Sequence, residues 1–472
     1  MQTQNNEFLA TEPIGPLLRK LAIPTITAQL INMLYNIVDR IYIGHMPDVG
    51  ALALTGVGVC MPFIMVITAF AMLIGSGGAP RASITMGEKN PSQAEHILGN
   101  CFALLVLISA MLTIVLLVWN RDFLLAFGAS ENTIEYASTY MSIYAIGTFF
   151  VQATLGLSAF ITAQGFTKVS MIAVVIGAVT NIVLDPILIY GLGMGVQGAA
   201  LATVISQGLS CFWVIRFLLG KKSILRLKVK YMRIQPKIIL PCLTLGLASF
   251  IMIASESLLA VTFNASLLRF GGDVAVGTMT IIMSVVQFAM LPLQGLAQGA
   301  QPISSYNYGA RNGARVKETF RKLLTISLIY SVTLWIIIML FPQGFIRMFT
   351  SDVSLLVFAP SAIRVYFAAL FAFGAQIACQ MTFVSIGNAK SSIVVAVLRK
   401  FVLLIPLIFI LPRVFTNDQT MAVFSAEPIA DILAVIFTVV LFAIQFRKSI
   451  KKLEIVHLQG QEQQTCQESS GV

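Results

Sequence analysis

The feature that most constrains this chain is a series of long apolar segments, each about long enough to cross a lipid bilayer. A membrane-spanning helix needs about 20 predominantly apolar residues, and twelve such segments occupy most of the 472 residues. Only 11% of the residues are charged, against about a quarter in soluble proteins. We therefore predict an all-α integral membrane protein. The twelve predicted spans lie near residues 17–43, 52–79, 97–119, 135–159, 169–190, 196–219, 237–263, 274–300, 320–342, 359–384, 392–412 and 421–446.

The positions of lysine and arginine predict how these helices are oriented. The formal net charge is +11, from 31 Lys and Arg against 20 Asp and Glu. If the N-terminus is cytoplasmic, most of the basic residues fall on the cytoplasmic side, as the positive-inside rule requires. In this assignment Arg399 and Lys400 extend along their helix to the cytoplasmic surface. The charge thus predicts a multi-pass protein of the cytoplasmic membrane with both termini inside, rather than a nucleic-acid partner.

The two halves of the sequence repeat each other. One constant offset aligns Pro24 with Pro241 and Asp39 with Glu256. Because each half has six spans, both halves enter the membrane from the same side and the repeat is parallel. Internal repeats of this kind are typical of transporters, with the substrate site near mid-membrane between the halves. A second, slightly larger offset aligns Gly77 with Gly299, Pro80 with Pro302, Asn90 with Asn312, Tyr144 with Tyr366, Gly165 with Gly387 and Lys168 with Lys390.

The repeat predicts a division of the chain into two lobes. A run of basic residues without acids separates the sixth and seventh spans and serves as the linker. The charged, Gln-rich sequence after the last span is expected to be unpacked. The predicted regions are a polar N-terminal segment (1–15), an N-lobe with helices 1–6 (16–220), a basic cytoplasmic linker (221–236), a C-lobe with helices 7–12 (237–446) and a polar cytoplasmic tail (447–472).

Acidic residues inside the predicted spans are the candidate functional groups, because an ionisable group in the bilayer costs several kcal/mol. Asp39 lies in the first span and is followed by Arg40, so an ion pair at the outer interface is an alternative, structural role. Glu256 lies in the seventh span. In the last span Glu427 precedes a proline near the outer end and is assigned a solvated or structural role, whereas the role of Asp431, one turn deeper, stays open.

Asp185 is the acid that is hardest to explain structurally, because no basic residue is near it in sequence. Asn181 and Asp185 are four residues apart, so both side chains lie on one helix face. Pro186 removes a backbone donor and leaves the carbonyl of Ile182 available to a cavity or an ion. Oxygen ligands of this kind suit a hard cation such as Na⁺, and a carboxylate in this place can also carry a proton.

Cysteine and histidine give no sign of a metal or disulfide framework. The six cysteines form no CxxC pair, and five of them lie in or beside apolar segments, as small hydrophobic residues do. The three histidines are far apart in sequence. We therefore expect no cofactor and no metal other than a coupling ion. The first dozen residues are polar and acidic without a basic region, so the first apolar helix is expected to act as the targeting signal.

In combination these features resemble the multidrug and toxic compound extrusion (MATE) family over residues 16–446. The resemblance rests on the two six-helix halves and on four local patterns. These are Leu21-Ala22-Ile23-Pro24 leading to Asp39, Gly77-Gly78-Ala79-Pro80-Arg81, its partner Gly299-Ala300-Gln301-Pro302, and Asn181-xxx-Asp185-Pro186.

The resemblance implies export of cationic amphipathic compounds by alternating access of two lobes, coupled to inward movement of Na⁺ or H⁺. It implies that Asp39, Asn181, Asp185 and Thr203 hold the coupling cation or proton in the N-lobe. Glu256 matches an acid of another branch and is a candidate second-lobe substrate or proton site. That branch also has an acid in helix ten, which this chain lacks, so we favour the N-lobe site. Helix one is expected to move at a hinge, Pro24.

Two other classes of protein are alternatives for this sequence. A flippase or exporter of a lipid-linked or metabolite substrate from the same superfamily would share the repeat, but it would usually need more helices or cavity-lining arginines. An integral-membrane enzyme would need clustered carboxylates for Mg²⁺ or a nucleophile with its base. No DDxxD, HExxH or GxSxG motif occurs, so we predict that the chain is not an enzyme. The expected partners are small-molecule substrates and membrane lipid, with no obligate protein partner.

Overall fold

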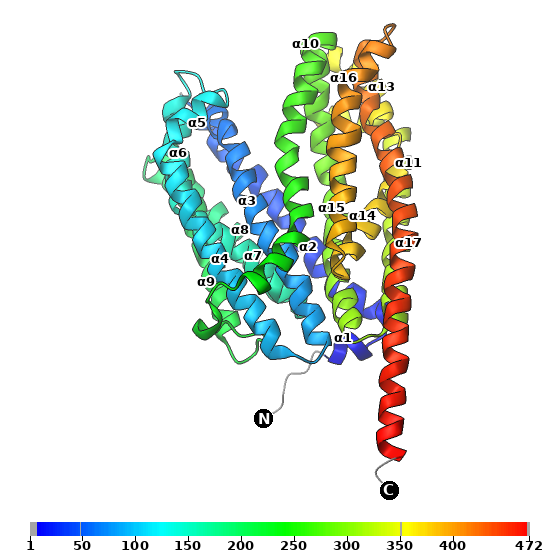
Figure 1. Ribbon diagram of the computed structural model, residues 1–472. Helices are drawn as coiled ribbons and strands as arrows, with labels where there is room; N and C mark the ends of the chain where they lie inside the picture. Colours follow the sequence, from blue (N-terminus) through cyan, green and yellow to red (C-terminus); the bar gives the residue numbers. More distant parts are fainter. Residues whose placement is uncertain (1–6, 48, 350–351, 470–472) are drawn as a thin grey trace. The chain divides into compact units, whose positions relative to one another are not determined.

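A computed structural model describes residues 7–47, 49–349 and 352–469, with side chains up to residue 455. Within these ranges every regular element is a helix (Figure 1). The elements are α1 (Glu7–Thr11), α2 (Ile14–Gly44), α3 (Gly50–Gly87), α4 (Pro91–Val118), α5 (Asn120–Ala126), α6 (Ile134–Ile146), α7 (Thr148–Ala163), α8 (Thr167–Pro186), η1 (Ile187–Gly191), α9 (Gly195–Leu219), η2 (Val229–Tyr231), α10 (Pro236–Gly309), α11 (Gly313–Leu340), α12 (Pro342–Arg347), α13 (Val353–Tyr366), α14 (Leu370–Ser385), α15 (Ala389–Val397), η3 (Leu398–Leu404), α16 (Ile405–Val414) and α17 (Gln419–Ser469).

The described helices account for the predicted spans. Nine are long and apolar enough to cross a membrane, and two bent pairs, α6 with α7 and α13 with α14, raise the number to eleven. One of the nine, α10, has 74 residues, and its backbone leaves the helical region at Gly272. Since about 20 residues suffice for one crossing, α10 covers the seventh and eighth predicted spans. The prediction of an all-helical membrane protein is confirmed.

The break in α10 depends on a glycine conformation. Gly272 has φ 62°, a left-handed value that side chains with a Cβ rarely adopt. The neighbouring turn is fixed by Thr420, whose hydroxyl donates to the Phe270 carbonyl at 2.8 Å. The two limbs of α10 on either side of Gly272 therefore turn back on each other, and residues of both enter the same apolar cluster.

Several features of the internal repeat recur at matching positions of the two halves. α4 and α11 have the same length and begin at matching positions of the repeat, each capped by an asparagine side chain, from Asn90 and Asn312. Lys89 and Arg311, which the same offset pairs, both adopt positive φ, as do Gly165 and Gly387. The bends between α6 and α7 (54°) and between α13 and α14 (45°) also fall at matching positions.

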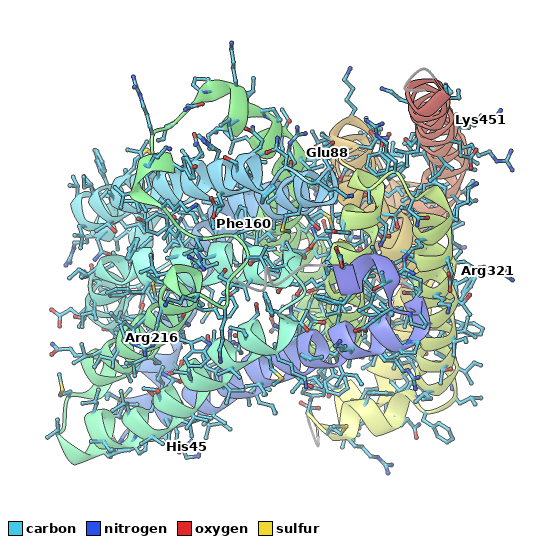
Figure 2. The ribbon with its side chains drawn as sticks, turned by 90° about the horizontal axis from the view of Figure 1, so that it is seen from below. His45, Glu88, Phe160, Arg216, Arg321 and Lys451 are labelled. Carbon is cyan, nitrogen blue, oxygen red and sulfur yellow. The ribbon has the colours of Figure 1, made fainter. Side chains whose placement is uncertain are left out.

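The chain divides into two compact units. The first unit comprises residues 7, 20–85 and 90–254, and the second comprises 8–19, 86–89 and 255–469. In the first unit Phe160 is fully buried within the helices (Figure 2). Gly78 faces its ring, and a Cβ at Gly78 would lie 2.6 Å from Phe160. Small residues therefore let these helices approach closely, as expected within a membrane.

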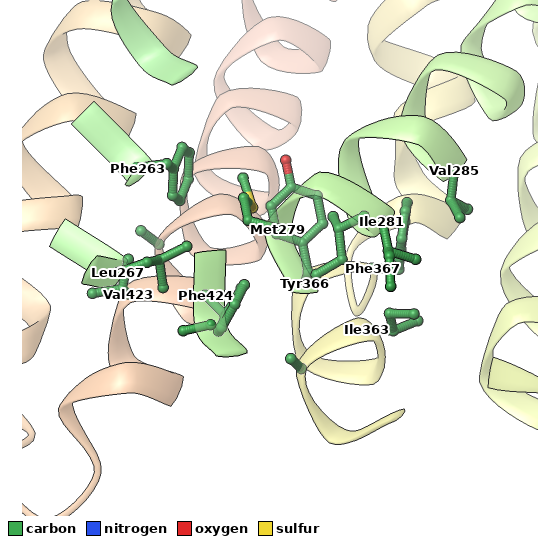
Figure 3. Close-up of a cluster of buried hydrophobic side chains, with 14 of the residues drawn as sticks. Phe263, Leu267, Met279, Ile281, Val285, Ile363, Tyr366, Phe367, Val423 and Phe424 are labelled. Atoms are coloured by element: carbon green, nitrogen blue, oxygen red, sulfur yellow. The ribbon is translucent and has the colours of Figure 1, made fainter. Parts of the chain in front are cut away.

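The core of the second unit is an apolar cluster from several helices (Figure 3). Phe263 and Leu267 come from the first limb of α10 and Met279 from the second, and they meet Tyr366 of α13 and Phe424 of α17. The cluster thus joins helices that are widely separated in sequence. It holds in place the polar residues on the same helices that are described below.

The expectation that the tail after residue 446 is unpacked is wrong for its described side chains. α17 continues without a break from the membrane span to Ser469. Ile450 is buried against Val316 and Ile386, and Lys317 donates to Glu454 at 2.8 Å. One face of the charged sequence is apolar enough to extend the last helix. The remaining residues of the predicted tail, 470–472, and residues 1–6 of the predicted N-terminal segment lie outside the described residues.

Candidate functional site

The buried polar residues of α8 lie on one face, as their spacing predicted. The Asn181 amide (Nδ2) donates to Oδ1 of Asp185 at 3.2 Å. Both residues are buried, with exposed fractions of 1% and 0%. A carboxylate in such a place must be stabilised by hydrogen bonds, a cation or a proton.

Two other helices of the first unit complete this group. The Asn181 amide also lies 3.5 Å from the hydroxyl of Thr203 on α9. Asp39 of α2 is buried, and its carboxyl is close enough to that of Asp185 to share a hydrogen bond when one of the two is protonated. The structure thus brings together Asp39, Asn181, Asp185 and Thr203, which we call the acid-pair site.

The acid-pair site has more oxygen acceptors than donors. Asp39 Oδ1, Asn181 Oδ1 and Asp185 Oδ2 are buried and have no hydrogen-bond partner among the described residues. Asp39 forms no ion pair in the described part of the chain. Arg40 instead points its guanidinium toward the sulfur of Met61, at 3.5 Å, in an exposed position. Unsatisfied oxygens around two carboxyl groups are what a hard cation or a proton requires.

The backbone next to Asp185 is irregular. α8 ends at Pro186 and continues as a π-helical turn, η1, a conformation that is frequent at functional sites. Tyr190 of η1 donates its hydroxyl to the Tyr42 carbonyl of α2 at 2.6 Å. This bond joins the helix of Asp185 to the helix of Asp39, one turn beyond Asp39. It therefore helps to position the two acids.

Sequence reasoning missed two tyrosines at this site. Tyr140 of α6 is buried close to Asp39 and is hydrogen bonded to Thr203. Tyr35 precedes Asp39 by one helical turn and interacts with both acids of the site. Tyr35 could have been predicted from the sequence, because residues four apart, such as Tyr35 and Asp39, share a helix face. Tyr140 could be found only from the packing of α6 against α9.

Glu256, the repeat partner of Asp39, lies in a different environment in the second unit. Its Oε1 accepts a hydrogen bond from Lys400 Nζ at 2.8 Å. The neighbouring residue, Arg399, binds two acids of α17, with Nη2 at 2.9 Å from Glu427 Oε1 and Nε at 2.6 Å from Asp431 Oδ1. These five residues form what we call the ion-pair cluster.

The predicted positions of Arg399 and Lys400 at the cytoplasmic surface are wrong. Both side chains are buried, with exposed fractions of 9% and 5%, and both are paired with acids. They belong to η3, a π-helical segment within the eleventh span. Carboxylates on α10 and α17 give them a closer partner than the aqueous phase does, so extension along the helix is unnecessary. Glu427, for which the sequence predicts a solvated or structural role, is buried and ion-paired, and of the two its contacts favour the structural role.

Pro24, the predicted hinge, lies within α2, which continues as one helix from Ile14 to Gly44. Proline removes the hydrogen bond to the carbonyl four residues earlier. The hydroxyl of Thr25 donates to the carbonyls of Leu21 and Ala22, at 3.2 and 2.9 Å, in the same turn. In the described residues, no group of three His, Cys, Asp or Glu side chains is arranged to hold a metal ion.

Apolar helices in two six-span repeats, with buried ionisable residues in each, define an integral-membrane transporter. The MatE family model matches residues 24–187 and 248–410, one match in each repeat. The chain therefore belongs to the MatE family of transporters, and it is not an enzyme. Members of this family are cation-coupled.

Named relatives and solved structures agree with this assignment. A multidrug export protein MepA of Staphylococcus haemolyticus is 24% identical over 443 residues, covering 93% of this chain and 95% of the relative. A MOP-superfamily transporter from Pyrococcus furiosus, described as having a binding pocket of reversed polarity, superposes with a TM-score of 0.88 at 23% identity over 96% of this chain and 99% of its own. An outward-facing multidrug resistance MATE transporter gives 0.88 at 22% identity, over 95% and 99%.

Proposed function

We propose that this transporter exports cationic amphipathic compounds by antiport against Na⁺ or H⁺. The observation that carries the proposal is the acid-pair site, with two buried carboxyl groups, no ion pair among the described residues and three unsatisfied oxygens. Such a site is unstable unless a cation or protons enter it. The substrate class is supported by the similarity to multidrug export proteins of staphylococci along most of their length.

In the proposed cycle, a cation or proton neutralises Asp39 and Asp185 in the outward-facing state. The ligands would be Asp39, Asn181, Asp185 and Thr203. Loss of the mutual repulsion between the two acids lets α2 shift, with Pro24 as the hinge, and the substrate is released. One charge that moves inward through 100 mV supplies about 2.3 kcal/mol. That energy suffices to bias an equilibrium between two states tenfold or more.

The proposed location is the cytoplasmic membrane with both termini in the cytoplasm. This orientation rests on the excess of Lys and Arg in the predicted cytoplasmic loops. Moving the buried Arg399 and Lys400 out of that count leaves the excess in place, because most of the basic residues lie in the linker, the loops and the tail. A reporter protein that fluoresces only in the cytoplasm should therefore be fluorescent when it is fused to either terminus.

The test of transport uses the full chain in proteoliposomes loaded with a cationic fluorescent dye. Dye movement is measured under an imposed Na⁺ gradient or an imposed pH gradient. We expect one of the two gradients to drive transport and Asp185→Asn to reduce it at least tenfold. The matched control is Asp122→Asn, the same change at an exposed position of the same unit. Full gradient-driven transport by Asp185→Asn would refute the acid-pair site.

The alternative, a flippase or exporter of lipid-linked or metabolite substrates, would need unpaired positive charge for an anionic group. Arg399 and Lys400 are buried near one another, but both are already neutralised by acids. Headgroup translocation by the reconstituted chain without dye transport under either gradient would favour this alternative.

A further inference from the structure

The basic linker, residues 221–236, is held on the first unit by buried side chains and is not a flexible tether. Gln164, at the end of α7, is fully buried, and its Oε1 accepts three hydrogen bonds from residues 223–225, at 2.9 to 3.1 Å. Glu95 of α4 is also buried, and its carboxylate accepts the backbone N–H of Arg226 at 3.3 Å. Because backbone donors of the linker are bonded to buried acceptors, the linker presents a fixed surface.

The linker lies at the level where α4 enters the membrane. Asn100 of α4 donates to the Tyr231 carbonyl at 3.1 Å and accepts the backbone N–H of Gln235 at 2.7 Å. α4 is long and apolar enough to cross a membrane, and its predicted span begins near residue 97. This part of the linker is therefore within about one helical turn of the start of the span. Figure 2 shows the linker at the edge of the first unit, beside α4.

The exposed face of the linker is strongly positive. In the described part of the chain only one of its basic residues, Lys228, forms an ion pair, and its partner is Glu95. The Nζ atoms of Lys228 and Lys230 lie 5.6 and 5.4 Å from the centre of the Tyr231 ring, which positions both ammonium groups beside one aromatic side chain. The linker has no acid, and all of its basic residues are exposed: Lys221, Lys222, Arg226, Lys228, Lys230 and Arg233.

An apolar side chain lies between these two lysines. Val229, in the short helical turn η2, is 81% exposed, the highest value among the large apolar side chains of the described residues. A single exposed apolar residue is ordinary on a protein surface. Val229, however, is flanked by lysines and lies beside the start of a membrane span. Apolar side chains among basic ones are typical of segments that lie in the membrane interface.

We propose that the linker binds anionic lipids of the adjacent leaflet, with Val229 inserted into the interface and the basic side chains paired with lipid phosphate groups. Positive side chains at a membrane surface attract anionic lipid, and this attraction falls off within a Debye length. Free phosphate would satisfy the same charges but would leave Val229 in water, so the occupant is a lipid. Bound lipid would fix the first unit to the leaflet where the chain passes from α9 to α10. The inference depends on neither the transported substrate nor the coupling ion.

The test measures binding of phosphatidylglycerol and of phosphatidylcholine to the full chain in detergent, by native mass spectrometry. Lys230→Gln/Arg233→Gln removes two charges from the linker and leaves the ion pair of Glu95 in place. The matched control, Lys451→Gln/Lys452→Gln, removes two exposed charges from α17.

Val229→Ser removes the exposed apolar side chain of η2. Its matched control is Val357→Ser, because Val357 of α13 is 76% exposed and lies in the second unit. All five substituted side chains and that of Val357 are exposed, and each variant is first shown to melt at the temperature of the wild type.

We expect the wild type to bind phosphatidylglycerol at least tenfold more tightly than phosphatidylcholine. The linker double variant should bind phosphatidylglycerol about tenfold more weakly than the wild type, and Val229→Ser about threefold more weakly. Both controls should bind it as the wild type does.

Three results would overturn the inference. Equal losses in the two double variants would show that binding follows total charge, and equal affinity for the two lipids would show that no anionic group is recognised. Displacement of phosphatidylglycerol by an equal concentration of inorganic phosphate would show that the site recognises a soluble anion. Dye transport is not a readout here, so failure of this inference leaves the proposed export function to its own test.

Discussion

The two units place an acid at equivalent points of repeat-related helices and surround it differently. Asp39 meets a second acid, Asp185, and forms no ion pair among the described residues. Its repeat partner Glu256 meets Lys400. A negative charge within a membrane protein must be neutralised. In the first unit this neutralisation requires a mobile cation or proton. In the second unit the side chain of Lys400 neutralises Glu256. Equivalent positions of the repeat thus hold an acid open to an exchangeable ion in one unit and an acid in an internal ion pair in the other.

The sharpest test of this comparison is to neutralise the repeat partners separately. We expect Asp39→Asn to reduce the rate of gradient-driven dye transport at least tenfold, because the acid pair is lost. Glu256→Gln should keep its dependence on the coupling ion but bind the dye about tenfold more weakly. Both variants are compared in proteoliposomes, with ion dependence and dye affinity measured separately. The same defect in both variants would show that the two sites do not differ in role.

The second prediction concerns stability in the second unit. Arg399→Met removes the partner of two buried acids and should destabilise the protein by about 3 kcal/mol, since a buried pair broken on one side leaves an uncompensated charge. Lys317→Met is the control, because its pair with Glu454 is about half exposed and on the surface, where ion pairs contribute about 0–1 kcal/mol. Denaturant unfolding in detergent measures both. Equal stability of the two variants would mean that the cluster is not buried in solution.

A smaller effect is expected at Thr203. Thr203→Val keeps the shape of the side chain and removes the hydroxyl that lies 3.5 Å from the Asn181 amide. We expect the concentration of coupling ion needed for half-maximal transport to rise severalfold, equivalent to about 1 kcal/mol, because the contacts of this hydroxyl with Asn181, Tyr140 and the Ala199 carbonyl are lost. Thr203→Ser, which keeps the hydroxyl, should behave as the wild type. A defect in Thr203→Ser equal to that in Thr203→Val would assign the effect to packing.

The smallest effect is expected at Pro24. Pro24→Ala restores a backbone donor in α2 and stiffens the helix. The acid-pair site is unchanged, so binding of the coupling ion should stay the same while the rate of dye transport falls a few-fold. Stopped-flow dye efflux at saturating ion concentration measures the rate. A changed ion affinity with an unchanged rate would contradict the hinge.

The sequence alone determined the elements and their repetition. Span length is dictated by membrane thickness, and apolar runs therefore mark the helices regardless of how they pack. The pairing of Asn90 with Asn312 and of Gly165 with Gly387 predicted a repeat whose caps and turns recur in the structure. The shared face of Asn181 and Asp185 followed from helical periodicity, and the structure places their side chains in contact.

Only the tertiary structure decided what each buried charge meets. Glu256 and Lys400 are 144 residues apart, and Arg399 and Glu427 are 28 apart, so no local pattern could pair them. η3 adds to this difficulty, because a π-helical turn changes the direction of side chains relative to the period of an α-helix. The sequence alone shows which charged residues lie within a span, where each has a free-energy cost. Its neutralisation depends on which helices pack together.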